Sequence, residues 1–304
     1  MSNSTLQAND LIVAYYPFTL IIVGTLLNLF TFFILCRSAF KDTKRQPVIH
    51  YMRTIAIFDI LMLYGWNLDH YLQIVHGYIL LIYSIPTCKI FGFLNYFAGQ
   101  SSAWLRVAIS FDRYLSASHL HRTIFNREKT ILIIIASIII FFLVLNLHFL
   151  IFTCFLTSNG FVDPNARFYV IYPLWDYVNL GFYNCVPTLL MIVFNSRTIY
   201  HLIHLRRVRI IQQSAIQHQA ISVTLILTTC LFLIMTIPAT IVAAFFFTIP
   251  TTILAKVLDS ILYTYHILSF VIYFLTFNAF RHEVLALLTC RKKNQQQIVP
   301  IRTN

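Results

Sequence analysis

Charged and polar residues stand inside stretches of the chain that are otherwise apolar. Asp59 lies within TIAIFDIL, and Arg106 lies within FAGQSSAWLRVAISF. The chain carries no motif of an enzyme's site: its histidines are scattered, and it has no HExxH pattern and no glycine-rich phosphate loop. A charge in apolar surroundings is costly unless it is paired. The chemistry open to these residues is therefore ion pairing and hydrogen bonding, and we expect no enzymatic activity.

Composition indicates that membrane-spanning helices hold these residues. Hydrophobic residues make up 59% of the 304-residue chain and charged residues only 11%, whereas soluble domains have about 45–50% and about 25%. Seven apolar segments each reach the length of about 20 residues that a spanning helix needs. They cover residues 11–36, 48–74, 85–116, 130–153, 171–204, 215–247 and 252–277. We expect an all-α membrane protein with a seven-transmembrane helix bundle over residues 11–277.

The net charge of +12 is distributed unevenly along the chain. Lysine and arginine gather in every second connection and in the tail, within residues 37–45, 122–129, 197–209 and 281–293. This is the positive-inside bias of a membrane protein, and it argues against a nucleic-acid partner. It predicts an extracellular N-terminus (residues 1–10), a cytoplasmic tail (278–304) and a multi-pass protein of the plasma membrane. Because residues 1–10 are polar without a positive start, we expect the first helix to direct insertion.

One long segment carries the most specific pattern. No proline interrupts the chain between Cys88 and Arg113, and these 25 helical steps span roughly 37 Å, more than the ~30 Å of a bilayer's hydrocarbon core. One helix therefore puts Cys88 at one membrane face and the triplet Asp112-Arg113-Tyr114 at the other. This arrangement resembles the third helix of a rhodopsin-like (class A) G-protein-coupled receptor. The resemblance implies a receptor that converts an extracellular ligand into activation of a heterotrimeric G protein.

The resemblance assigns roles in coupling and activation to residues on several helices. Arg113 would enter the G-protein interface when helix 6 swings outward, and Asp112 would hold it in the inactive state. The remaining matches are Tyr114 in the triplet, Pro187 in helix 5, Phe232 and the hinge Pro238 in helix 6, and Tyr273 ahead of Phe280-Arg281, where an amphipathic helix 8 is expected.

Several positions depart from the family pattern. Thr236 stands where helix 6 usually has a tryptophan, and Asn195 stands where helix 5 usually has a tyrosine. Ser269-Phe270 replaces the usual Asn-Pro of helix 7. Divergent invertebrate neuropeptide receptors that resemble the FMRFamide group also lose that proline, and in this respect the chain is similar to them.

The resemblance also implies a buried polar cluster at mid-membrane. Asn28 would tie helices 1, 2 and 7, Ser269 would face the same region, and Asp59 with Ser102 would bind a sodium ion, the only cofactor that we expect. Arg106 is a departure, because the family normally has an apolar residue at that position. We hypothesise that Arg106 forms an ion pair with Asp59; the alternative is an interhelical or snorkelling arginine with no role in signalling.

Three cysteines and one sequon indicate covalent modification. The resemblance implies that Cys88 forms a disulfide at the outer face. Cys154 is the other cysteine near that face; a buried free thiol is the alternative. Asn3, in Asn-Ser-Thr, is a glycosylation site on the predicted outer side. Cys290 precedes Arg-Lys-Lys and is placed for palmitoylation or stays a free cysteine.

The outer halves of the helices carry candidate ligand contacts. Asn95, 18 residues before Arg113, stands where amine receptors have an aspartate, so a monoamine ligand is not expected. Carboxylates in a partly desolvated pocket favour a cationic group, and aromatic rings favour a cation or a second ring. We therefore expect a short peptide with a basic residue near an aromatic end; the alternative is that the carboxylates are solvated at the rim or pair with Lys256. The candidate contacts are Asp69, Asn95, Tyr96, Tyr183, Asp259 and Tyr263, the last where an opsin has its retinal lysine.

Two further classes stay open. A seven-helix transporter or chemosensory channel also consists of apolar helices, although transporters tend to show matching broken helices in two halves. A receptor-like protein that no longer signals would also explain the departures at Arg106, Asn195 and Thr236.

Overall fold

Helices make up nearly all of the chain that the structure, a computed structural model, describes: residues 8–40, 48–118, 128–171, 173–208, 213–246 and 253–289. The α-helices are α1 (Ala8–Leu35), α2 (Val48–Leu63), α3 (Trp66–His76), α4 (Leu80–Tyr83), α5 (Ile85–Ala117), α6 (Glu128–Ile151), α7 (Leu174–Asn179), α8 (Val186–Val208), α9 (Gln213–Phe245), α10 (Ile253–Tyr265), α11 (Leu268–Thr276) and α12 (Asn278–Leu288). A short 3₁₀ turn, η1 (Ser38–Phe40), a π-helical turn, η3 (Leu180–Cys185), and two strands, β1 (Thr153–Leu156) and β2 (Val162–Ala166), complete the described elements.

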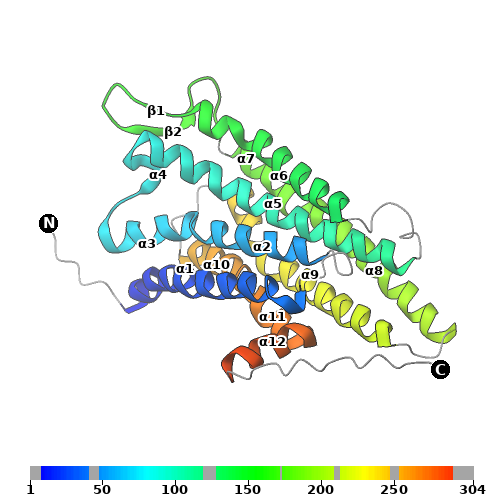
Figure 1. The fold of residues 1–304 in the computed structure, drawn as a ribbon. Helices are drawn as coiled ribbons and strands as arrows, with labels where there is room; N and C mark the ends of the chain where they lie inside the picture. The colour runs from blue at the N-terminus through cyan, green and yellow to red at the C-terminus, as the bar shows by residue number, and fades with distance from the viewer. Residues whose placement is uncertain are drawn as a thin grey trace, which may run out of the picture.

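The helices form a seven-transmembrane bundle (Figure 1), which confirms the predicted fold class. Five spans within the described residues are long and apolar enough to cross a membrane, and the bent pair α10 and α11 is a sixth. The seventh is α5, whose 33 residues span roughly 50 Å. It is less apolar than the others because it buries polar side chains such as Gln100, Ser101 and Ser102 inside the bundle.

Helix α5 lies in the interior and packs against α2, α6 and α8. Its first turn is fixed by a capping box, in which the Ser84 hydroxyl accepts from the Thr87 N–H and the Thr87 hydroxyl accepts from the Ser84 N–H. Pro86 suits the first turn, where its missing N–H leaves no donor unsatisfied. The sequence thus fixes where the central helix begins.

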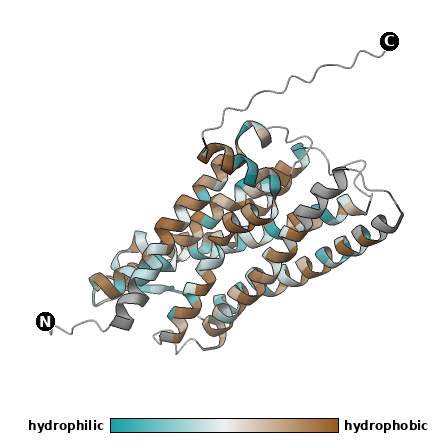
Figure 2. Ribbon diagram, turned by 90° about the horizontal axis from the view of Figure 1, so that it is seen from below, coloured by the Kyte–Doolittle hydropathy of each residue, from teal (hydrophilic) through white to brown (hydrophobic). Residues whose placement is uncertain are grey.

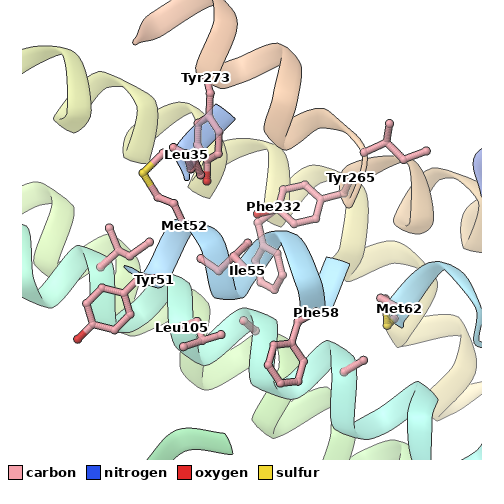
Figure 3. Packing of buried hydrophobic residues seen from close by; sticks show 14 of the residues in the cluster. Leu35, Tyr51, Met52, Ile55, Phe58, Met62, Leu105, Phe232, Tyr265 and Tyr273 are labelled. Atoms are coloured by element: carbon pink, nitrogen blue, oxygen red, sulfur yellow. The ribbon is translucent and has the colours of Figure 1, made fainter. Parts of the chain in front are cut away.

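Apolar side chains fill the bundle and also cover its outside. Figure 3 shows Ile55 and Phe58 of α2, Leu105 of α5 and Phe232 of α9 converging in the interior. Large aliphatic residues such as Leu26, Ile133 and Ile140 are 60–64% exposed, and the helices are largely apolar in Figure 2. An apolar outer surface is what contact with lipid tails requires.

The two ends of the bundle are finished differently. At one end β1 and β2 pair as an antiparallel hairpin, and the predicted disulfide Cys88–Cys154 ties the hairpin to α5, with 6.1 Å between the Cα atoms. Cys154 sits at a register shift in β1 with a φ of 60°. At the other end α12 supplies the expected helix 8, held to the end of α1 by an Arg37–Glu283 ion pair of 3.2 Å.

Candidate functional site

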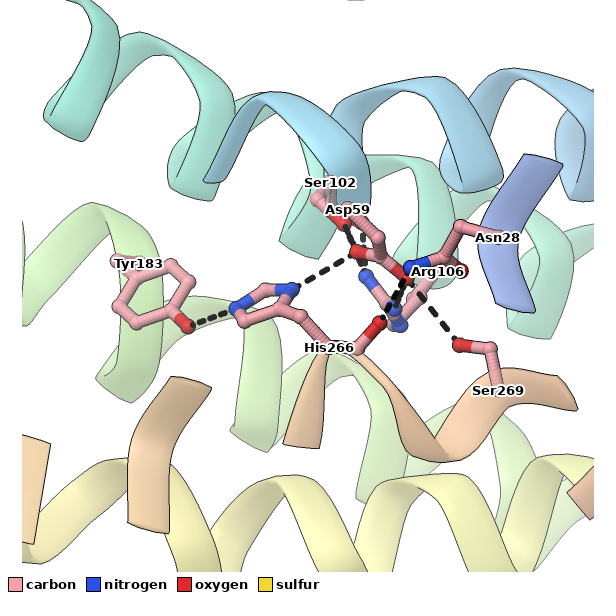
Figure 4. Close-up of polar contacts among 7 residues, drawn as sticks. All are labelled: Asn28, Asp59, Ser102, Arg106, Tyr183, His266 and Ser269. Carbon is pink, nitrogen blue, oxygen red and sulfur yellow. Dashed lines mark hydrogen bonds and ion pairs between the residues drawn. The ribbon is translucent and has the colours of Figure 1, made fainter. Parts of the chain in front are cut away.

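Asp59 is the centre of a polar cluster buried in the middle of the bundle (Figure 4). Its side chain is fully buried, and both carboxylate oxygens accept two contacts. Oδ1 accepts from the Ser102 hydroxyl at 2.7 Å and lies 2.8 Å from Nδ1 of His266. Oδ2 accepts from Arg106 Nη2 at 2.7 Å and from the Ser269 hydroxyl at 3.1 Å. Helices α2, α5 and α11 and the turn before α11 therefore meet on one carboxylate.

Arg106 forms the hypothesised ion pair with Asp59. Its side chain is only 7% exposed, and its second amino group donates to the carbonyl of Ser102 at 3.1 Å and to the Ser102 hydroxyl. The guanidinium carbon lies 5.0 Å from the ring centroid of Tyr265, a cation–π contact. Arg106 is thus held by groups on its own helix, on α2 and on α10, so it does not snorkel to the membrane surface.

These residues do not fit the sodium ion that the resemblance implies. A carboxylate offers about four lone-pair directions, and Asp59 already accepts four contacts. The guanidinium also supplies the positive charge that a sodium ion would bring. Binding sodium at Asp59 would require Arg106 to leave.

His266 is a member of the cluster that the sequence analysis missed. It lies in the turn between α10 and α11, where the helix bends by 42°, and it is fully buried. Its Nε2 lies 3.0 Å from the Tyr183 hydroxyl, and its carbonyl accepts from the Asn28 side chain at 3.0 Å. The sequence offered one signal for this residue: it is a histidine inside an apolar span, seven residues before Tyr273.

The expected coupling residues lie toward the opposite end from the hairpin. Arg113 donates to its neighbour Asp112 at 2.6 Å, and both side chains are buried. Tyr114 stacks on Phe194 of α8, with 6.0 Å between the ring centroids. Tyr273 and Arg106 line the same small internal cavity of about 30 Å³. Arg106 therefore borders the same cavity as the expected activation residue Tyr273.

Phe232 and Pro238 of α9 lie in different surroundings. Phe232 is fully buried between the rings of Tyr183 and Tyr265, at 5.5 and 5.3 Å between centroids. Pro238 lies inside α9 with its side chain exposed, where its missing N–H leaves a helical carbonyl unpaired.

A larger cavity of about 300 Å³ opens toward the hairpin end of the bundle. Five of the six predicted ligand contacts line it, together with Trp66, His70 and Asp176; the five are Asn95, Tyr96, Tyr183, Asp259 and Tyr263. The Tyr263 hydroxyl donates to Asn95 at 3.1 Å, and the Tyr96 hydroxyl donates to Asp176 at 2.8 Å. Asp259 lies 3.9 Å from His70, beyond hydrogen-bond length.

Asp69 is not one of the described residues that line this cavity, contrary to the prediction. Its Oδ1 accepts from the backbone N–H of Leu80 at 2.6 Å. The reason is local: α3 ends at Gly77 with a φ of 71°, the chain turns back into α4, and the N–H at the start of α4 needs an acceptor. Asp176 of α7 supplies the second cavity carboxylate instead.

Two predicted modification sites lie outside the described residues. Asn3 and Cys290 both fall in the parts of the chain for which no structure is described. Glycosylation of Asn3 and palmitoylation of Cys290 stay predictions.

Comparison with known proteins is consistent with this geometry. A family model described as 7 transmembrane receptor (rhodopsin family) matches residues 27–275. Two similar curated proteins are the rhodopsin of Galeus melastomus, 26% identical over 104 residues, and that of Leucoraja erinaceus, 26% identical over 103 residues. Each match covers 34% of this chain and 28% of the relative's length.

The ion pair predicts strong coupling between Asp59 and Arg106. Asp59→Asn or Arg106→Leu alone leaves one charge buried without its partner, which typically costs about 3–5 kcal/mol. We expect each single variant to lower the unfolding temperature and the cell-surface amount sharply, and the double variant to recover much of both.

A matched cycle on Arg37–Glu283, in which the arginine side chain is 32% exposed and the glutamate 6%, serves as the comparison. Its coupling should be smaller than that of Asp59 and Arg106, because the Arg37 guanidinium still reaches water. Additive losses at Asp59 and Arg106 would show that the two charges act independently.

Proposed function

Since this chain belongs to the rhodopsin family of seven-transmembrane receptors, we propose that it binds an extracellular ligand and activates a heterotrimeric G protein. The observation that carries this proposal is the pairing of two sites in one bundle. A cavity of about 300 Å³ with two carboxylates opens at the hairpin end, and the Asp112–Arg113 pair lies toward the other end. Ligand and G protein would bind at these separate ends.

We place the hairpin end outside the cell and α12 in the cytoplasm of a plasma-membrane receptor. The Cys88–Cys154 disulfide supports this orientation, because disulfides persist in oxidising compartments. The basic clusters in alternate connections support it as well.

In the resting receptor, we propose that Asp112 occupies Arg113. The two side chains are 6–8% exposed and 2.6 Å apart, so the guanidinium is engaged within its own helix. Activation would move α9 outward at its cytoplasmic end, pivoting near Pro238, and free Arg113 for the G protein. Phe232 of α9 and Tyr273 of α11 would repack during this movement, since both are buried in the core of the bundle.

We propose that the ligand is a short peptide carrying a cationic group next to an aromatic residue. Asp259 and Asp176 supply the negative charge, and a cation paired with a partly desolvated carboxylate gains a charge-assisted hydrogen bond. Trp66 and Tyr263 supply ring faces in the same cavity. A volume of about 300 Å³ suits one end of a peptide, with the remainder passing outward. Such a ligand agrees with the resemblance to FMRFamide-type receptors.

Retinal is not part of this proposal, although the similar proteins are rhodopsins. Residue 263, where the resemblance places an opsin's lysine, is a tyrosine bonded to Asn95. A seven-helix channel or transporter is not carried further, because the matched family is a receptor family.

G-protein coupling predicts that signalling without added ligand depends on Arg113. We expect Arg113→Ala to lower basal signalling roughly 10-fold or more, as a loss of about 1.4 kcal/mol or more of coupling free energy would. The measurement is nucleotide exchange by reconstituted G proteins of several subtypes on membranes with matched receptor amounts.

The matched control is Arg167→Ala, which removes an exposed arginine at the hairpin end. It should behave like the native chain. Exchange above that of receptor-free membranes that is equal for the native chain and for Arg113→Ala would contradict G-protein activation through Arg113.

The cavity predicts that Asp259, and not Asp69, sets peptide potency. For any agonist from a library of short basic-aromatic peptides, Asp259→Asn should weaken potency about 10- to 100-fold, because a hydrogen bond to a charged group contributes about 1.5–3 kcal/mol. Asp69→Asn should leave potency unchanged, since an asparagine oxygen still accepts from Leu80. Dose–response curves in which Asp69→Asn loses as much as Asp259→Asn would show that the cavity is wrongly assigned.

A further inference from the structure

Position 236 of α9 carries a small threonine, and its partner on the neighbouring segment lies in η3. Thr236 is fully buried, and its hydroxyl bonds within α9 to the Phe232 carbonyl and across to Asn184 Oδ1, each at 2.6 Å. Asn184 in turn donates to Thr240, one turn further along α9. The side of α9 that faces η3 therefore carries small hydroxyl residues, which leaves room for a side chain from η3.

Tyr183 of η3 packs against the same helix one turn away, at Phe232. It is 2% exposed and lines the outer cavity, and its ring stands edge-on to Phe232 at 5.5 Å. The π-helical turn ends at Cys185, two residues before Pro187 at the start of α8, and Pro187 has no N–H to offer the carbonyl of Tyr183. π-Helical turns inside α-helices are frequent at functional sites. The local sequence thus directs a tyrosine to the floor of the ligand cavity.

The hydroxyl of Tyr183 reaches across the bundle to His266. The distance to Nε2 is 3.0 Å, and Nδ1 of the same ring lies 2.8 Å from Asp59 (Figure 4). A carboxylate only accepts, so Nδ1 carries a proton, and Nε2 of the neutral ring accepts from Tyr183. Tyr183, His266, Asp59 and Arg106 therefore form one unbroken chain of hydrogen bonds.

The chain joins two cavities and a helix bend. Tyr183 borders the outer cavity, and Arg106 borders the inner cavity beside Tyr273. His266 lies at the 42° bend between α10 and α11, where its side chain is held from α2 and η3 and its carbonyl is held by Asn28 of α1. A change at Tyr183 can therefore reach α9 through Phe232 and helix 7 through His266.

We propose that the Tyr183–His266 hydrogen bond is the ligand-sensing element of this receptor. The inference rests on the proposed receptor function. A ligand group that contacts Tyr183 pulls its hydroxyl from His266 and its ring from Phe232. The bend at His266 and the position of α9 are then no longer fixed, and α9 moves outward. Tyr183 and His266 are positioning residues that act through Phe232 and Asp59.

The test measures the position of α9 in the full-length protein without ligand or G protein. Spin labels at Val223→Cys in α9 and Leu132→Cys in α6, both exposed positions, report the separation of the cytoplasmic ends in lipid nanodiscs. The native cysteines other than the disulfide pair are first replaced; they are Cys36, Cys185, Cys230 and Cys290. Tyr183→Phe keeps the ring and removes the hydrogen bond. We expect the ratio of outward to inward populations to rise about threefold, the effect of an average hydrogen bond between membrane helices.

A second variant keeps the test independent of how well Tyr183→Phe folds. His266→Asn retains a short amide that can donate to Asp59 but cannot reach Tyr183. It should shift the distances as Tyr183→Phe does. The double variant should add nothing further, because both single variants and the double variant remove the same hydrogen bond between Tyr183 and His266. Tyr16→Phe is the matched control: its hydroxyl bonds to Thr264, two residues before His266, on the exposed face of the bundle. It should leave the distances unchanged.

The outcomes separate this inference from the proposed function. Unchanged distances in Tyr183→Phe and His266→Asn, additive shifts in the double variant, or an equal shift in Tyr16→Phe would overturn the inference, even if Arg113→Ala shows that G-protein coupling exists. A shared, non-additive shift would support it, even if no G protein responds, in which case only the coupling proposal would fail.

Discussion

A single ion pair in the middle of the membrane, Asp59 with Arg106, constrains the rest of the structure. A charge at this depth is costly, and water is not available to satisfy it. Each charge must therefore be met from several helices, and Asp59 gathers side chains from α5, from α11 and from the turn before α11. The bend in helix 7, the placement of Ser269 and the buried histidine all follow from this requirement.

The departures from the family pattern are compensated by contacts elsewhere in the bundle. Arg106 replaces an apolar residue and pairs with Asp59. Thr236 replaces a tryptophan and donates to Asn184 of η3 at 2.6 Å. Asn195 replaces a tyrosine and donates to Thr229 at 2.8 Å. Compensation at each position is what a folded, working bundle requires, and it weakens the view that the departures reflect loss of function.

Much of the fold could be predicted because it depends on composition and on the lengths of the apolar segments. The seven spans follow from the apolar segments, whereas helix 8 and the Cys88–Cys154 disulfide are what the resemblance to the receptor family implies. The candidate site was harder to predict. Asp69 was predicted to be a pocket residue, but the turn at Gly77 brings the backbone N–H of Leu80 to its carboxylate, which accepts a hydrogen bond from it. Asp176 and His266 were missed because their importance depends on which helix faces they occupy, and the sequence alone does not fix how neighbouring helices rotate against each other.

The central claim is that Arg106 is a cation built into the site at which this family would hold sodium. The most direct measurement is the unfolding temperature of the purified protein as sodium replaces potassium at constant ionic strength, since an ion that binds only the folded state raises it. We predict no sodium dependence for the native chain and a sodium-dependent rise for Arg106→Leu, in which Asp59 lacks its cation. A rise in the native chain as large as that in Arg106→Leu would contradict the account.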